Sequence, residues 1–93
     1  MTVAFYATLR DKTGTATYEL DLSEPTRLDE ILRRLIAIFP ALKEDLFDEN
    51  GNLSHHLHLF RNGRDVRFLN ALETIIEPTD TLALIPPVGG GST

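Results

Sequence analysis

The sequence predicts an α+β domain, with one main helix packed on one face of a mixed sheet of about five strands. Three features predict it. Apolar and polar residues alternate in short runs near both ends of the chain, as they do in half-buried strands. Apolar residues recur at helical spacing across residues 28–39. The pair Asn62-Gly63, which favours a two-residue hairpin turn, stands between two further apolar runs.

The first two predicted strands form a hairpin. Residues 3–9 alternate, residues 10–14 suit a polar turn with a glycine, and residues 17–22 alternate again. The residues expected to point inward are Val3, Phe5, Ala7, Leu9, Tyr18, Leu20 and Leu22.

The main helix is predicted to follow this hairpin. Ser23-Glu24-Pro25 breaks the second strand, and Thr26 is the expected N-cap. Pro40 ends the helix, because proline has no amide hydrogen to donate within a helix. Residues 42–47 predict one more helical turn, and residues 48–52 predict a loop.

The turn at Asn62-Gly63 sets the register of the second hairpin. The expected pairs are Arg61 with Arg64, Phe60 with Asp65, Leu59 with Val66 and Leu57 with Phe68. Residues 69–78 predict an irregular connection, with a short helical turn near 72–76, and residues 81–85 predict the last strand.

The order of these elements is that of a β-grasp (ubiquitin-like) fold. It places the domain in residues 1–85 and an extended tail in residues 86–93. The expected core consists of Val3, Phe5, Leu20, Leu32, Leu35, Leu59, Val66, Leu82 and Leu84.

The composition narrows the classes of function. The chain of 93 residues suits one domain, and its net charge of −5 argues against a nucleic-acid binder, which needs a basic face. Without cysteine there is no disulfide framework and no cysteine nucleophile. No apolar run approaches the ~20 residues of a membrane span, and no signal peptide is recognisable. We therefore expect a cytoplasmic protein that is a monomer alone and binds neither membranes nor nucleic acids.

The tail is the most informative segment for function. Pro86-Pro87 cannot continue a sheet ladder and favours an extended conformation, and Val88 and Gly89-Gly90-Gly91 follow. At about 3.3 Å per residue, residues 86–91 span roughly 20 Å. Such a thread suits entry into a narrow active site of another protein. A frayed terminus is the alternative.

Several segments carry a family likeness. They are Leu9-Arg10-Asp11-Lys12-Thr13-Gly14, Phe39-Pro40-Ala41-Leu42, the stretch from Arg61 to Leu69, and the stretch from Asp80 to Val88 with the Gly-Gly pair after it. With them the chain resembles the ubiquitin-like sulfur-carrier family of the MoaD/ThiS type. That family includes the small subunit of molybdopterin synthase, the thiamine and cysteine-pathway sulfur carriers, and the archaeal small modifier proteins. The Pro-Pro-Val-x-Gly-Gly ending is the most specific of these segments.

The resemblance implies how the tail works. Gly90-Gly91 would be the reactive terminus, which an adenylating enzyme of the ubiquitin-activating type activates with ATP. A sulfur donor would convert the acyl-adenylate to a thiocarboxylate, and a sulfur-accepting synthase would consume it. Some family members are instead joined to lysines of other proteins. The catalytic machinery would belong to the partners, so this chain would be a non-catalytic carrier, or the small subunit of a synthase, with no cofactor bound.

Ser92-Thr93 departs from the family pattern, because Gly91 is not the last residue. Three explanations are open. The two residues are a remnant of cloning, or a peptidase removes them to expose Gly91, or the chain does not carry sulfur.

A docking surface is expected on the outward face of the sheet. In a β-grasp sheet the first and last strands are central neighbours, and the last lies beside the third. Tyr6, Phe60, Ala83 and Ile85 would then form one apolar patch leading to the tail.

Other candidate sites are weaker. His56 and His58 share a strand face, but two imidazoles at this spacing do not complete a zinc site, and a solvent-facing strand is favoured. The carboxylates of residues 45, 48 and 49 lack the spacing of a calcium loop and predict a solvated acidic surface. Lys12 and Lys43 could accept conjugation, although ordinary surface lysines are the simpler interpretation. No nucleophile–base set is present, so we expect neither a catalytic residue nor a metal site.

Three functions remain open at this point. The leading one is a sulfur carrier for a biosynthetic pathway, whether of molybdopterin, thiamine or cysteine. The second is a ubiquitin-like modifier of lysines. The third is a β-grasp binding module that uses its sheet face and never activates its tail.

Overall fold

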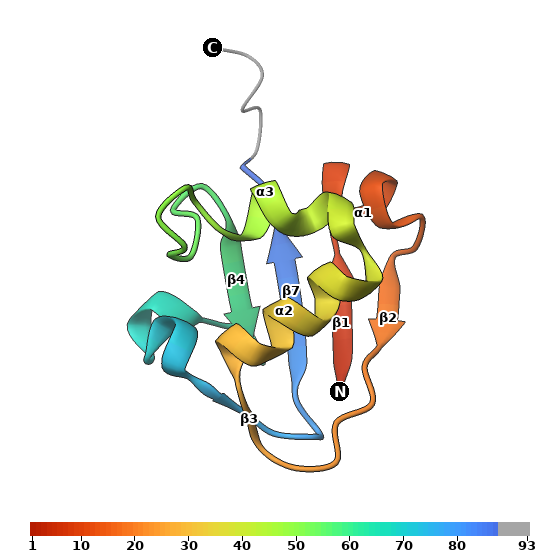
Figure 1. Cartoon of the computed structure of the whole chain (residues 1–93). Coiled ribbons are helices and arrows are strands. Elements are labelled where there is room, and N and C mark those ends of the chain that lie inside the picture. Colours follow the sequence, from red (N-terminus) through yellow and green to blue (C-terminus); the bar gives the residue numbers. More distant parts are fainter. Residues whose placement is uncertain (88–93) are drawn as a thin grey trace.

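The chain folds around a mixed sheet of five strands, in the order β2-β1-β7-β4-β5 (Figure 1). The computed structural model describes residues 1–87. The strands are β1 (Thr2–Phe5), β2 (Thr17–Glu19), β4 (His58–Arg61), β5 (Arg64–Asp65) and β7 (Thr81–Ile85). β1 and β7 are parallel, and the other neighbours are antiparallel. This is the β-grasp topology expected from the order of the elements.

The helices cover one face of this sheet, and α2 crosses it (Figure 1). They are α1 (Thr8–Thr13), α2 (Leu28–Ile38) and α3 (Lys43–Leu46), with 3-10 turns η1 (Pro40–Leu42), η2 (Val66–Phe68) and η3 (Ala71–Glu73). A small second sheet pairs β3 (Thr26–Arg27) with β6 (Ile75–Ile76). The predicted helix end at Pro40 and the further turn at residues 42–47 are therefore confirmed.

The core lies between α2 and the sheet, and every residue of the predicted core is buried. α2 contributes Leu28, Ile31, Leu32 and Leu35, each with none of its surface exposed. Phe39 packs edge-on against the rings of Phe5 and Tyr18, at centroid distances of 5.6 and 5.3 Å. The helical periodicity of α2 and the alternation in the strands thus each identified residues of the same hydrophobic core.

The first predicted strand is too long. β1 ends at Phe5, the backbone turns at Ala7 with a φ of 50°, and α1 begins at Thr8. Leu9 is buried as expected, but from a helix, and Ala7 is exposed rather than inward. Gly14 ends α1 in the left-handed conformation, with its N–H donating to the carbonyl of Arg10 at 2.8 Å. The predicted polar turn is therefore a short helix with a glycine cap.

The expected N-cap at Thr26 is wrong, because that residue belongs to β3. Its hydroxyl donates to the carbonyl of Glu24 at 2.9 Å, not to the helix. The amide of Leu28 instead donates to the carbonyl of Thr74 at 2.8 Å. A carbonyl from a distant segment thus accepts the first free amide of the helix, and the local sequence does not reveal this partner.

The hairpin turn is confirmed, and the register holds only next to it. Asn62 and Gly63 have φ values of 50° and 84°, as a type I′ turn requires. Phe60 pairs with Asp65, and Arg61 with Arg64.

The outer pairs of the predicted hairpin do not form. η2 starts at Val66, and the Asp65 carboxylate accepts the amide of Arg67 at 2.9 Å. The expected pairing of Leu59 with Val66 and of Leu57 with Phe68 is therefore wrong. Val66 is still buried, whereas Phe68 is 84% exposed. In the connection that follows, the helical turn is η3, and Ile76 lies in β6 rather than in that turn.

Asp80 anchors the start of β7 through a buried hydrogen-bond network. Its carboxylate accepts Arg61 Nε at 2.6 Å, Asn62 Nδ2 at 2.9 Å and the amide of Glu77 at 2.7 Å. Burial alone would raise the pKa of Asp80, but the hydrogen bonds from Arg61, Glu77 and Asn62 outweigh it and hold that pKa below its usual value. Asp80 thus joins the hairpin turn to the start of the last strand, together with the two hydrogen bonds between Asn62 and Thr81.

We expect Asp80→Asn to lower the free energy of unfolding at pH 7 by about 2–3 kcal/mol, because it removes charge-assisted hydrogen bonds. A lowered folded-state pKa contributes stability above the unfolded value, about 3.9, and that contribution is lost as pH falls through the folded value. The wild-type chain should therefore lose more stability than the variant when urea unfolding is followed from pH 6 to pH 3. Exposed Asp21 provides the control, Asp21→Asn. Parallel pH curves for wild type and Asp80→Asn would contradict this role.

Candidate functional site

The central strand β7 leads the chain toward its C-terminal end. β7 is hydrogen-bonded on one side to β1 and on the other to β4. Pro86 is buried and Pro87 is exposed, so the chain emerges from the body between these two prolines. The predicted tail residues Val88, Gly89, Gly90 and Gly91, with Ser92-Thr93, lie outside the described residues. Pro86 and Pro87, which we call the tail root, thus follow the middle strand of the sheet.

A shallow hollow of about 230 Å³ adjoins this root. Its lining combines α3, the loop before β4 and the two prolines, namely Glu44, Asp45, Ser54, His56, Leu57, Pro86 and Pro87. Acidic and imidazole side chains therefore line a hollow next to the point where the chain leaves the domain.

The four residues predicted to form a docking patch lie on the face of the sheet opposite α2. Ala83 pairs with Phe60 on β4, and its other neighbour on β1 is Ala4. Ile85 is the next outward residue along β7. Tyr6 follows β1, and its amide donates to the carbonyl of Leu84 at 3.2 Å, which places it beside the end of β7. Tyr6 is 42% exposed, and the others are half-buried. The structure brings all four together, and we call them the sheet patch.

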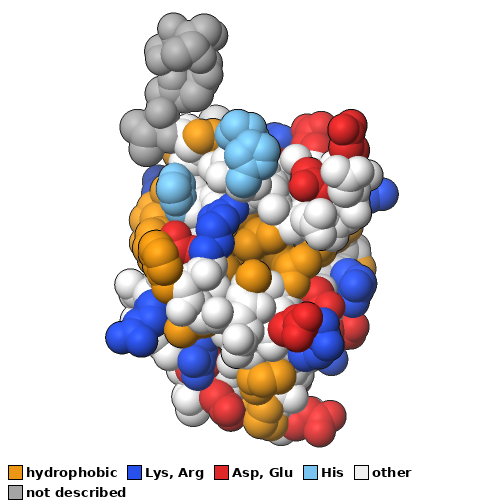
Figure 2. Space-filling model, turned by 90° about the vertical axis from the view of Figure 1, so that its left-hand side faces the viewer, with side chains coloured by type: hydrophobic (Ala, Val, Ile, Leu, Met, Phe, Trp, Pro, Cys, Tyr) orange, Lys and Arg blue, Asp and Glu red, His pale blue; other side chains and the backbone are white. Residues whose placement is uncertain are grey.

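His58 extends the sheet patch and was not assigned to it from the sequence. It pairs with Ile85 across β4 and β7, and its ring stacks on Phe60 at 6.5 Å. The alternation of β4 was the available signal, because it places His58 and Phe60 on one face. Figure 2 shows histidine side chains at the end of the molecule where β7 ends.

Arg67 holds the loop that carries the other histidines. Its guanidinium donates to the carbonyl of Leu57 at 2.7 Å and also to the carbonyl of Ser54. The rings of His55 and His56 lie 4.1 Å apart within this loop. Across residues 1–87, no group of three or more His, Asp or Glu side chains is arranged to hold a metal ion. Arg67 thus stabilises the loop before β4 through these two hydrogen bonds.

The acidic loop has a local structural role as well. The Asp48 carboxylate accepts the amides of Asn50 and Asn52 at 2.9 and 3.0 Å. Asp45 faces α1 and accepts a hydrogen bond from Lys12 Nζ at 2.6 Å.

In the described part of the chain, no helix combines the length and apolar character that crossing a bilayer requires.

Comparison with known proteins identifies a family. A model of the ThiS family matches residues 3–91. Small archaeal modifier protein 1 of Haloferax volcanii is 33% identical over 86 residues, which cover 92% of this chain and 94% of the relative. A crystal structure of that Haloferax protein superposes with a TM-score of 0.84 and 32% identity, covering 98% of both chains.

Two further matches involve proteins named CysO. The sulfur carrier protein CysO of Mycobacterium tuberculosis is 31% identical over 93 residues, covering 98% of each chain. The crystal structure of the Amycolatopsis orientalis BexX/CysO complex contains a chain that matches with a TM-score of 0.81 and 28% identity, covering 97% of this chain and 98% of that one.

Proposed function

The chain belongs to the ThiS family, and we propose that it is a sulfur carrier whose Gly90-Gly91 end is adenylated and then converted to a thiocarboxylate. One observation carries the proposal. The family match covers residues 3–91 and so stops before Ser92, and Pro86, the residue that follows the central strand β7, is buried. The chain would present a carboxylate at the end of an extended tail, and that tail would follow a strand that is hydrogen-bonded on both sides.

The proposed chemistry needs nothing from this chain beyond its carboxylate. A carboxylate oxygen attacks the α-phosphorus of ATP, pyrophosphate leaves, and an acyl-adenylate forms. Sulfide from a sulfur donor then attacks the carbonyl carbon, the bond from that carbon to AMP breaks, and a thiocarboxylate and AMP are formed. Glycine suits this site because it has no Cβ and adopts a wide range of backbone angles. We infer that ATP is bound and used by an adenylating enzyme of the ubiquitin-activating type, with no cofactor held by the carrier.

Two more partners follow from this proposal. A sulfur-accepting synthase would consume the thiocarboxylate, and a processing peptidase would remove Ser92-Thr93. The Amycolatopsis structure is that of a complex between BexX and CysO, and it supports the idea that a carrier of this shape works bound to a partner protein. We place the activity in the cytoplasm, where ATP is available.

We propose that the sheet patch docks the adenylating enzyme. Aromatic and aliphatic residues grouped on one face are favoured interface anchors, and this group leads directly to the tail root. Phe60 lies on β4, where it pairs with Ala83 of β7 and its ring stacks with that of His58.

We expect Phe60→Asp to weaken binding to the adenylating enzyme by about 2 kcal/mol or more, the range of an interface hot spot. The melting temperature should change little, because Phe60 is half-buried on the solvent side of the sheet. Titration calorimetry and thermal unfolding separate the two effects. The exposed Phe68, away from β7, provides a control as Phe68→Asp, which should bind normally. Loss of stability with intact binding would make Phe60 a packing residue instead.

A ubiquitin-like modifier is the alternative, because the Haloferax relative is named a modifier protein. It would use the same activation but end as an amide bond to a lysine of a target. A binding module that never activates its tail is the remaining candidate, and retention of Ser92-Thr93 in cells would favour it.

The intact mass of the protein from its own cells tests the proposal. A sulfur carrier should show the mass of residues 1–91, together with a species in which one oxygen is replaced by sulfur. A series of heavier species joined to other proteins would support the modifier instead. A single mass that retains Thr93 would exclude both.

A further inference from the structure

The amino groups of this chain differ sharply in their surroundings. They are the α-amino group of Met1 and the side chains of Lys12 and Lys43, because the sequence holds no other lysine. Each is a candidate nucleophile toward an activated carboxyl group. An amine must be deprotonated and free to move before it can attack such a carbonyl. The structure separates the three by the partners that each one has.

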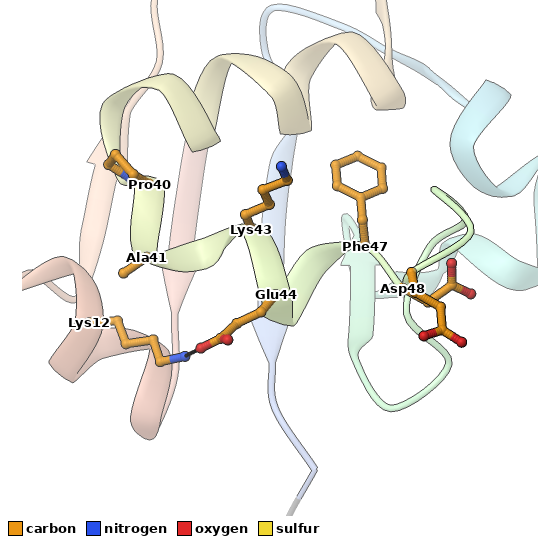
Figure 3. A pocket seen from close by; sticks show the side chains of 8 residues that line it. Lys12, Pro40, Ala41, Lys43, Glu44, Phe47 and Asp48 are labelled. Atoms are coloured by element: carbon orange, nitrogen blue, oxygen red, sulfur yellow. Dashed lines mark hydrogen bonds and ion pairs between the residues drawn. The ribbon is translucent and has the colours of Figure 1, made fainter.

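Lys12 is held by two carboxylates of α3. Its Nζ lies 2.6 Å from Asp45 Oδ2. It also lies 3.2 Å from Glu44 Oε1, the contact drawn in Figure 3. Hydrogen bonds to Asp45 first, with Glu44 adding to them, raise the pKa of Lys12 despite its partial desolvation. The ammonium is thereby favoured over the nucleophilic amine. Acylation of Lys12 would also break the contact between α1 and α3.

The α-amino group of Met1 is held as well. It donates to the carbonyl of Leu20 at 3.0 Å in a partly buried position, at the edge where β1 meets β2. Its hydrogen bond and its place beside the sheet limit the approach of a bulky acyl donor.

Lys43 is different from both. It is exposed at the start of α3, and within residues 1–87 its ammonium has no ion pair and no hydrogen bond. Figure 3 shows that Lys43 and Glu44 leave α3 on different sides. Lys43 borders two shallow hollows of about 680 and 470 Å³, which also share Phe47, Asp48 and Glu49. The hollow beside Pro86 and Pro87 does not include it.

We propose that Lys43 is the acceptor amine of this chain, and that its acyl donor is the activated Gly91 end of a second copy. A second copy is the donor in this proposal, because Glu44 and Asp45 line the hollow at Pro86 and Pro87, whereas Lys43 does not and leaves α3 on a different side from Glu44. The inference rests on the proposed activation of Gly91. In the step, Lys43 Nζ forms a bond to the carbonyl carbon, the bond from that carbon to its leaving group breaks, and the leaving group takes the proton. The product is an amide-linked dimer.

The test uses a donor that needs no adenylating enzyme. The donor is residues 1–91 prepared as a C-terminal alkyl thioester, with Lys12→Arg and Lys43→Arg so that neither position can accept. The acceptor is the full 93-residue chain, whose Thr93 carboxylate is not activated. We expect a dimer linked mainly through Lys43 in peptide mass spectra. Lys43→Arg in the acceptor should remove most of it, and Lys12→Arg should leave its yield unchanged.

A further variant tests the reason for the selectivity. Asp45→Asn removes the shorter of the two contacts to Lys12, so acylation of Lys12 should rise severalfold while that of Lys43 stays the same. Lysine amide added to the same thioester shows that the donor is reactive, and circular dichroism shows that each variant is folded.

The proposal is overturned if Lys12 or Met1 is acylated as much as Lys43, or if no dimer forms while lysine amide is acylated. Because the thioester replaces enzymatic activation, either failure counts against Lys43 alone. A failure of adenylation at a free Gly91 end would instead count against the sulfur-carrier proposal, whatever the thioester experiment shows.

Discussion

A chain that ends at Gly91 should support ATP–pyrophosphate exchange by its adenylating enzyme, and the chain that ends at Thr93 should be slower by about 100-fold or more. Ser92 and Thr93 move the carboxylate about 7 Å past its productive position. Displacing a reacting group by only 1 Å can already cost about 100-fold in rate. Both side chains also occupy a channel that is expected to admit glycine alone.

Measuring the affinity for the adenylating enzyme shows whether the extra residues impair binding of the carrier or only the placement of its carboxylate. The sheet patch lies outside the tail, so both chains should bind with similar affinity while only one exchanges pyrophosphate. A Gly91-terminated chain with Phe60→Asp should show the converse, weak binding with exchange recovered at high carrier concentration. Equal exchange for the two lengths would remove the need for a peptidase. No exchange for either length would favour the binding module.

Leu35→Ala should lower the free energy of unfolding by about 2–5 kcal/mol, the range seen when a buried leucine is truncated. Leu35 lies on the inner face of α2 and is fully buried against the sheet. Truncation therefore leaves a cavity that the neighbouring strands cannot fill without moving. Denaturant unfolding measures the loss, and an unchanged m-value would show that the unfolding transition itself is unaltered.

The same helix provides a matched control. Ile38 is 41% exposed at the end of α2, so Ile38→Ala should cost about 1 kcal/mol or less. A loss below ~0.5 kcal/mol for Leu35→Ala, or equal losses for both variants, would mean that Leu35 does not lie on the face of α2 that packs against the sheet.

Much of the fold is determined by short-range patterns in the sequence. Asn62-Gly63 specifies its turn because both residues tolerate positive φ, and Pro40 stops α2 because it has no amide hydrogen. The alternation in β7 and the helical spacing in α2 identify buried residues correctly, because burial of one face produces these periods. The outward set of the sheet follows from the same alternation, so the sequence alone could group Tyr6 with Phe60 and Ile85.

Features that depend on contacts between residues far apart in the chain could be determined only from the tertiary structure. Leu9 is buried from a helix and Phe68 is exposed, although alternation places both on strand faces, since period two cannot show where a strand ends. The start of α2 depends on a carbonyl 46 positions later, at Thr74. The sequence alone does not distinguish Lys12 from Lys43. Their difference comes from the packing of α1 against α3, which brings Asp45 to Lys12 across 33 positions and leaves Lys43 facing solvent. Local patterns encode faces and turns, whereas charge pairing and the ends of elements depend on which segments meet in space.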